Sequence, residues 1–295
     1  MDCGTNSTRL LVIDGDGREL CREMRITRLG QGVNDSRRLA DAAIERTVQA
    51  LREYRSIADR LGVGYMRVLA TSAARDAQNR DSFFDAAENA TGVRPELLTG
   101  IEEGELTYAG ATRDLPSKNY LVVDIGGGST EFVLGTNGVV AARSVDVGCV
   151  RLTEEMLRSD PYAPEELSNA FSIVEEWCTE VSSELPIIVA EPELVGVAGT
   201  VTSLAAMDLG LTSYIREKTH HHRLTHDAVE ELFRSLSMQS EAQRSQDPLL
   251  PPGRSDVLTA GTIILLGIMR HFTVESCLVS ESDILDGAAG ETQQS

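Results

Sequence analysis

Two apolar runs flank a glycine turn in the stretch VVDIGGGSTEFVLG, residues 122–135. This pattern predicts a strand that ends near Asp124, a tight turn, and a second strand that leads away from the turn. A similar stretch, DCGTNST at residues 2–8, is also followed by an apolar run, and aspartate, glycine, serine and threonine fall at the same four offsets in both. The repeat indicates two duplicated units, each offering one turn to a shared cleft.

The remainder of the chain alternates between predicted strands and predicted helices, which is typical of α/β architecture. At about 150 residues per domain, a chain of 295 residues suggests two domains. Because Pro116 breaks the pattern just before the second copy of the repeat, we expect one domain at residues 1–117 and the other at residues 118–295.

Two elements of the first domain illustrate how the hydrophobic pattern is interpreted. Apolar residues predict a strand near residues 24–29, and apolar spacing predicts a helix over residues 36–61. Asp35 or Ser36 is the candidate N-cap of that helix.

Composition and charge exclude several classes of protein. Hydrophobic residues make up 41% of the chain, and no apolar run approaches the roughly 18 residues of a membrane span. The chain starts without a signal-peptide pattern, and its five cysteines form no CxxC pair, so we expect a cytoplasmic protein that does not act at a membrane. A net charge of −19 repels nucleic acid, so no nucleic-acid partner is expected.

Glycine-rich turns between strands can point several backbone N–H groups the same way and so bind an anion. The two repeated turns and a third, GVAGTVTS at residues 196–203, have this composition. Each turn alone is compatible with an ordinary connection, but three together favour a phosphate site.

Carboxylates beside a phosphate site need a cation between the two negative charges. Asp2 and Asp124 directly precede the glycines, and Glu131 follows Asp124 by seven residues. Mg²⁺ commonly binds one or two carboxylates together with phosphate oxygens, so these residues suggest a magnesium site. An exposed position on the strand is an equally good interpretation of Glu131.

Other polar residues are ambiguous on their own. Glu102, Glu103 and Glu105 are what the first turn of an ordinary helix would contain. Arg75 and Asn79 are candidate phosphate ligands or plain surface residues. The run at residues 220–222, three histidines, fits a solvated or substrate-contacting loop better than a metal site.

Taken together, the motifs resemble the exopolyphosphatase/guanosine pentaphosphate phosphohydrolase (Ppx/GppA) family in its short two-domain form. The matching segments are DCGTNSTRLLV, RLGQGV, ATSAARDAQN, GIEEGELTYAGA, VVDIGGGSTEFVLG, SVDVGCVRLTE, GVAGTVTSLAA, HRLT and GRSDVLTAGTIILLGIM. The resemblance implies two ribonuclease H-like domains of the actin-like ATPase superfamily around a central cleft. The chain departs from the family at Leu285 and Asp286, where an arginine is usual.

The resemblance also assigns roles to residues. It implies Glu103 as the catalytic residue, and Asp124 and Glu131 as residues that hold Mg²⁺, with Mn²⁺ as an alternative. Phosphate would be bound by two loops and an arginine: Gly4, Thr5, Asn6, Ser7, Gly126, Gly127, Gly128, Ser129 and Arg75.

The expected function is Mg²⁺-dependent hydrolysis of the terminal phosphoanhydride bond of inorganic polyphosphate, preferably of short chains, by a homodimer. Two alternatives stay open: a pppGpp 5′-phosphohydrolase, and a regulator that binds (p)ppGpp without turnover. A sugar or acetate kinase of the same superfamily would instead need an acceptor for the phosphoryl group.

Overall fold

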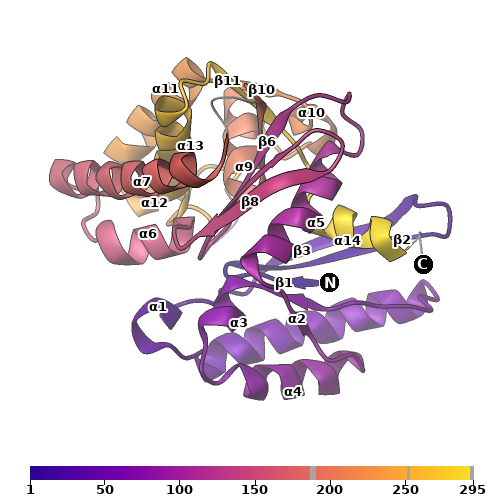
Figure 1. Ribbon diagram of the computed structural model, residues 1–295. Coiled ribbons are helices and arrows are strands. Elements are labelled where there is room, and N and C mark those ends of the chain that lie inside the picture. Colours follow the sequence, from indigo (N-terminus) through magenta and orange to yellow (C-terminus); the bar gives the residue numbers. More distant parts are fainter. Residues whose placement is uncertain (187–190, 251–252, 293–295) are drawn as a thin grey trace.

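The computed structural model describes residues 1–186, 191–250 and 253–292, which form two α/β halves in contact with each other (Figure 1). The first half holds a five-stranded sheet in the order β3-β2-β1-β4-β5. Its strands are β1 Asp2–Cys3, β2 Ser7–Ile13, β3 Glu19–Ile26, β4 Leu69–Ala70 and β5 Glu96–Leu97. The second half holds a six-stranded sheet in the order β10-β11-β9-β6-β7-β8. Its strands are β6 Tyr120–Ile125, β7 Thr130–Gly135, β8 Val139–Val145, β9 Glu193–Val197, β10 Arg223–Thr225 and β11 Ser276–Val279.

Both sheets have the same topology. In each, the first three strands form an antiparallel meander, and two later strands add in parallel beside the first: β4 and β5 beside β1, and β9 and β11 beside β6. Only β10, an antiparallel edge strand, has no counterpart among the described strands. The duplicated α/β fold predicted from the repeat is confirmed. Asp2, paired with Arg9, and Asp124, paired with Glu131, occupy equivalent places.

Helices cover the sheets (Figure 1). The first half contributes α1 Val33–Ser36, α2 Asp41–Arg60, α3 Ser72–Asp76, α4 Arg80–Thr91 and α5 Gly100–Thr112. The second contributes α6 Cys149–Met156, α7 Pro164–Glu184, α9 Ala198–Asp208, α10 Arg216–Thr219, α11 His226–Met238, α12 Glu241–Arg244, α13 Leu258–His271 and α14 Ile284–Thr292.

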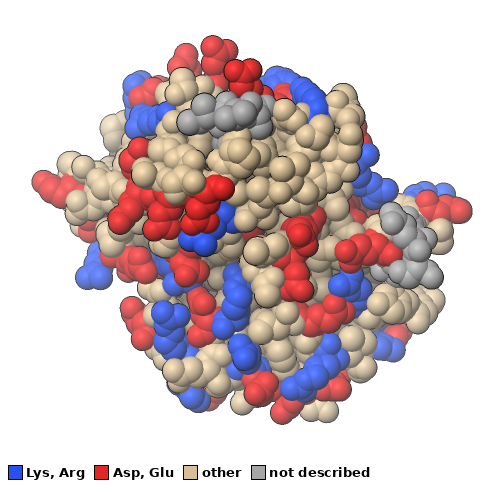
Figure 2. Space-filling view, in the orientation of Figure 1, with Lys and Arg blue, Asp and Glu red and all other residues tan. Residues whose placement is uncertain are grey.

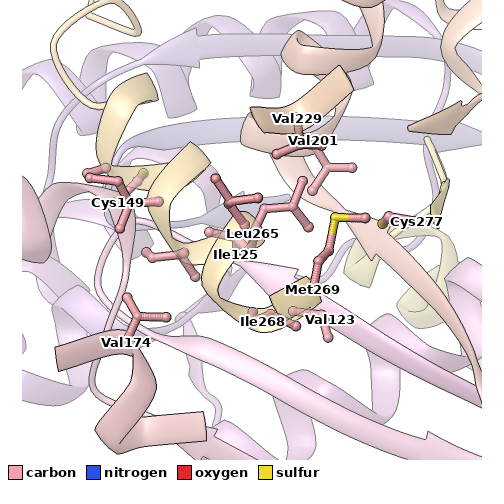
Figure 3. Packing of buried hydrophobic residues seen from close by; sticks show 14 of the residues in the cluster. Val123, Ile125, Cys149, Val174, Val201, Val229, Leu265, Ile268, Met269 and Cys277 are labelled. Atoms are coloured by element: carbon pink, nitrogen blue, oxygen red, sulfur yellow. The ribbon is translucent and has the colours of Figure 1, made fainter. Parts of the chain in front are cut away.

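The largest core lies in the second half and is built around α13, which is apolar on all sides because it is buried on all sides. Figure 3 shows Leu265, Ile268 and Met269 of this helix in one cluster with Val123 and Ile125 of β6. This packing fixes the strand that ends at the second glycine turn.

Among the described residues, no helix is both long and apolar enough to cross a membrane. On the face shown in Figure 2, acidic and basic side chains are interspersed and do not separate into two areas. The cytoplasmic location expected above stays a prediction.

Two elements predicted from the hydrophobic pattern have different boundaries in the structure. The long helix begins at Asp41, after Ala40 and without a side-chain cap, so the proposed caps at Asp35 and Ser36 are wrong. Residues 33–36 instead form the separate turn α1, which ends at Arg37 in a left-handed conformation. The strand expected near residues 24–29 is β3, shifted toward the N-terminus because it forms a hairpin with β2.

Helices α5 and α14 cross at very short range between the two halves (Figure 1). A Cβ atom on Gly110 would lie 2.0 Å from the carbonyl oxygen of Asp283, and one on Gly287 would lie 1.9 Å from that of Leu106. Because α14 packs on α5 and on β2, the end of the chain returns to the first sheet. The domain boundary at residues 117/118 stays a prediction.

Because the two helices lie so close together, one added methyl group at Gly287 should destabilise the fold. Replacing Gly287 with alanine should lower the free energy of unfolding by about 1–3 kcal/mol, because two helix backbones would have to separate. A Cβ atom on Gly290 of the same helix would meet no atom of a neighbouring element within 4 Å, so Gly290→Ala is the matched control and should be neutral or stabilising. Urea denaturation of both variants checks this, and equal stabilities would contradict it.

Candidate active site

A cavity of about 480 Å³ lies between the two halves and is lined by both copies of the repeat. Its lining includes ten of the residues expected from the sequence: Gly4, Thr5, Asn6, Ser7, Glu103, Asp124, Gly126, Gly127, Gly128 and Ser129. Glu131 and Arg75 lie just behind this lining, since Glu131 pairs with Asp124 across the strands and Arg75 contacts Glu103. The structure therefore brings all twelve residues to one place.

The second loop, residues 126–129, is held by the start of helix α6. The carbonyls of Gly126, Gly127 and Gly128 accept hydrogen bonds from the N–H groups of Cys149 (2.9 Å) and Val150 (2.8 Å) and from Nε of Arg151 (2.8 Å), respectively. Because the C=O and N–H of a peptide unit point in opposite directions, carbonyls drawn toward α6 leave N–H groups turned toward the cavity. This is the geometry of an anion cradle.

The first loop, residues 4–7, is built in the same way. In each loop the N–H of the leading glycine donates to the serine carbonyl three residues later, over 3.0 Å. The carbonyl of Thr5 accepts from Gly30, and that of Asn6 accepts from Thr27 and Arg28. Two cradles related by the repeat thus line one cavity.

The two loops approach each other too closely for larger residues. A Cβ atom on Gly127 would lie 2.9 Å from Cβ of Thr5, and one on Gly128 would lie 2.5 Å from Oγ of Ser72. The glycines are needed here for space, because the halves meet at the floor of the cavity.

Glu103, near the start of α5, lines the cavity beside Arg75, and its side chain is 12% exposed. Nη1 of Arg75 donates to Oε2 of Glu103 over 3.2 Å and to the carbonyl of Leu98 over 3.0 Å. Burial, and then the charge of Glu131, raises the pKa of Glu103 well above its usual range. Arg75 thus orients this carboxylate; its assignment as a phosphate ligand stays a prediction.

The two neighbouring glutamates, Glu102 and Glu105, do not line the cavity. Glu102 forms a capping box with Thr99, in which the N–H of Thr99 donates to the Glu102 carboxylate and Oγ1 of Thr99 accepts from the N–H of Glu102. Glu105 points into solvent. Of the three acidic residues that the sequence could not distinguish, only Glu103 lines the cavity.

Asp124, in the lining of the cavity, and Glu131, its partner across the strands, form a buried carboxyl pair. Thr107 donates to Asp124 over 3.2 Å, and Ser144 donates to Glu131 over 2.7 Å. Burial raises the pKa of Asp124 to about 6, and burial together with the charge of Asp124 raises the pKa of Glu131 to about 8. The exposed-strand interpretation of Glu131 is wrong, since only 1% of the residue is exposed.

These carboxylates fit a hard divalent cation. Oε2 of Glu131 and Oδ1 of Asp2 are buried, and neither has a hydrogen-bond partner in the described part of the chain. Oxygen atoms of this kind are the ligands that Mg²⁺ and Mn²⁺ take, with phosphate and water completing the shell. A cation would also offset the cost of ionising these two buried carboxyl groups.

Arg9 and Asp283 line the same cavity and were missed in the sequence. Arg9 donates from Nε (3.0 Å) and Nη2 (2.7 Å) to Oδ2 of Asp2, and its Nη1 pairs with Asp283. A signal was present, because Arg9 follows Asp2 by seven residues, as Glu131 follows Asp124. Asp286, one of the two positions noted above as a departure from the expected pattern, forms an ion pair with Arg22 of β3 over 2.7 Å.

Arg254 is a further missed residue of the cavity. Its guanidinium packs over Gly199 at the start of α9, and its Nε has no partner among the described residues. Burial lowers the pKa of Arg254, which is the expected result for a cation without a full set of counter-ions. An anion in the cavity would relieve that cost.

The histidine run forms part of a hydrogen-bonded loop. Nδ1 of His220 accepts from the N–H of Glu281 over 3.1 Å, so its Nε2 carries the proton and donates to Asp114 over 2.9 Å. His222 contacts Asp208 over 2.6 Å. The side chains of Asp114, His220 and His221 lie close enough together to hold a metal ion, so the expectation of a solvated or substrate-contacting loop stays a prediction.

Two repeated α/β halves, each with a glycine-containing loop, enclose a cavity beside a cluster of carboxylates, which is the arrangement expected of a phosphate-binding α/β protein. The chain belongs to the Ppx/GppA phosphatase family, whose family model matches residues 12–288. The predicted family is thereby confirmed, and the duplicated α/β fold is shared with a solved member of that family. Membership of the actin-like ATPase superfamily stays a prediction.

Individual relatives cover nearly the whole chain. The sequence is 40% identical to Exopolyphosphatase 2 of Mycobacterium tuberculosis, over 98% of this chain and 96% of the relative. A crystal structure described as an exopolyphosphatase-like protein has a TM-score of 0.95 at 35% identity, covering 99% of this chain and 97% of the other. The crystal structure of the Aquifex aeolicus family member has a TM-score of 0.81 at 30% identity, covering 99% and 96%.

Proposed function

We propose that the protein is an exopolyphosphatase, which hydrolyses the terminal phosphoanhydride bond of inorganic polyphosphate and releases orthophosphate. The observation that carries this proposal is the largely buried carboxylate of Glu103 in the same cavity as the two loops. The name of the 40% identical mycobacterial relative supports the same substrate class.

Different residues carry out different parts of the proposed hydrolysis. The N–H groups of the two loops hold phosphate oxygens, and this positioning with charge neutralisation is most of what phosphoryl transfer requires. Arg75 holds one oxygen of Glu103, which leaves the other to orient a water molecule and accept its proton. A carboxylate of raised pKa is the stronger proton acceptor once it is ionised.

A divalent cation, Mg²⁺ or Mn²⁺, would be held by Asp124 and Glu131. When bound, it supplies positive charge that neutralises the phosphate oxygens as the bond breaks. The unpartnered Glu131 oxygen gives this carboxylate a free ligand atom.

The experiment is orthophosphate release by the purified protein from short polyphosphate, long polyphosphate, pppGpp and ATP in parallel. We expect release from polyphosphate with Mg²⁺, faster for short chains, and loss of release in EDTA. Release mainly from pppGpp would replace the proposal with the pentaphosphate phosphohydrolase. Binding of (p)ppGpp without any release would indicate the regulator.

The cation should also stabilise the protein in a pH-dependent way. Because the pKa of Glu131 rises from 4.5 to about 8 on folding, the metal-free protein holds a proton that the unfolded chain releases, and it loses stability as the pH rises from about 4.5 through about 8. We therefore expect Mg²⁺ to raise the melting temperature little at pH 5 and more at pH 8. Differential scanning fluorimetry with an ionic-strength-matched NaCl control measures this. Glu131→Gln should flatten the dependence, and a wild-type shift that is equal at both pH values would contradict it.

A further inference from the structure

Arg151, the third residue of α6, is bound on every side of its guanidinium, and its partners belong to both halves of the protein. Nε donates to the carbonyl of Gly128 in the second loop, over 2.8 Å. Nη1 donates to Asn34, just inside α1, and Nη2 to Asp76, the last residue of α3. The side chain is 11% exposed, so these contacts are sheltered from water.

The contact with Gly128 has a direct geometric consequence. The carbonyls of Gly126 and Gly127 are held by backbone N–H groups of α6, whereas the carbonyl of Gly128 is held by the side chain of Arg151. That carbonyl shares a peptide unit with the N–H of Ser129, which must point the opposite way, toward the cavity that Ser129 lines. Arg151 therefore sets the direction of one donor of the anion cradle.

The contact with Asp76 connects the same side chain to the residues around Glu103. Asp76 follows Arg75 in α3, and Arg75 donates to Oε2 of Glu103. A single guanidinium thus links the phosphate loop of the second half to the helix of the first half that orients the carboxylate.

We propose that Arg151 is a positioning residue, which turns the Ser129 N–H toward bound phosphate and does so fully only while Asp76 and Asn34 of the other half hold its remaining nitrogens. This inference rests on the proposed function in one respect, that the second loop binds phosphate. Arg151 itself touches no reacting atom.

The test compares binding of inorganic tripolyphosphate with Mg²⁺, by calorimetry, in a Glu103→Gln background that does not consume it. Arg151→Gln should raise the dissociation constant about tenfold or more, as expected when one oriented donor to an anion is lost. Arg151→Lys keeps the charge but not the planar fork, so it should recover the binding only in part. Arg67→Gln is the matched control, because Arg67 is 20% exposed and pairs with Glu96 and Glu291 away from the cavity, and it should bind as the background does.

A second readout separates positioning from stability. If Asp76 acts through Arg151, the double variant Arg151→Gln/Asp76→Asn should bind no more weakly than Arg151→Gln alone, whereas independent effects would multiply. The melting temperatures of the Arg151 and Arg67 variants should fall by similar amounts. Binding within twofold of the background in Arg151→Gln, or equal weakening in Arg67→Gln, would overturn the inference.

Failure of the proposed function would be visible separately. If the wild-type protein binds tripolyphosphate but releases no orthophosphate from any substrate, the proposed hydrolysis is wrong, and the Arg151 comparison is then made in the wild-type background. If the wild-type protein binds no tripolyphosphate, both the proposed function and the role of Arg151 are wrong.

Discussion

Replacing Glu103 with glutamine is expected to lower kcat by about 10²- to 10⁴-fold, the range for removal of a general base. The glutamine can still accept a hydrogen bond from Arg75, so the start of α5 keeps its contacts. It cannot take a proton from water. The loss should therefore fall on kcat, with tripolyphosphate affinity unchanged or improved, because one negative charge leaves a cavity that receives an anion.

The neighbouring helix position gives the control. Glu105 lies on the same helix and is exposed, so Glu105→Gln should keep wild-type kcat and a wild-type melting temperature. Steady-state orthophosphate release measures kcat for both variants, and calorimetry measures the tripolyphosphate affinity of Glu103→Gln. A Glu103→Gln enzyme that turns over at the wild-type rate would show that another group activates the water.

The repeat in the sequence correctly predicted the duplicated fold and the position of both glycine-containing loops at one cavity. Four matched positions predicted two equivalent strand–turn–strand units, and both loops carry the same glycine-to-serine hydrogen bond. What the repeat could not show was how its unmatched positions differ. Arg9 and Glu131 stand at one offset with opposite charge, so one loop has an internal cation and the other has a surplus of carboxylates.

Asp283 was missed in the sequence because it lies far along the chain from its partner Arg9. Asp283 reaches Arg9 only because α14 returns to cross α5, and that crossing depends on a close backbone approach at Gly110 and Gly287. A glycine inside a helical segment carries no local sign of such an approach. Arg75 shows the same limit, since its motif marked it as important but not that its partner would be Glu103.

The surplus of carboxylates at the second loop leads to a prediction for the substitution of Asp124. Asp124→Asn is expected to lower kcat/KM on the order of 10²- to 10³-fold, because a ligand of the proposed cation is lost. The same substitution should raise the metal-free melting temperature above pH 6. Burial holds the pKa of Asp124 at about 6, so its ionised form destabilises the fold as the pH rises through that value, and asparagine removes this cost while still accepting from Thr107.

Replacing Asp2, the equivalent aspartate of the first loop, should change the stability of the protein in the opposite direction. Asp2 accepts two hydrogen bonds from Arg9, so Asp2→Asn weakens an ion pair that is largely buried and should lower the free energy of unfolding by on the order of 1–3 kcal/mol.

Melting curves of the two variants at pH 8 in EDTA give a matched comparison, since the residues are equivalent in the repeat and both are buried. If both substitutions destabilise the protein, Asp124 is a favourable part of the metal-free fold, and its surplus charge is not what the cation relieves. If Asp124→Asn is the more stable variant and the less active one, the second loop keeps a destabilising carboxylate for the sake of catalysis, as strained functional sites do.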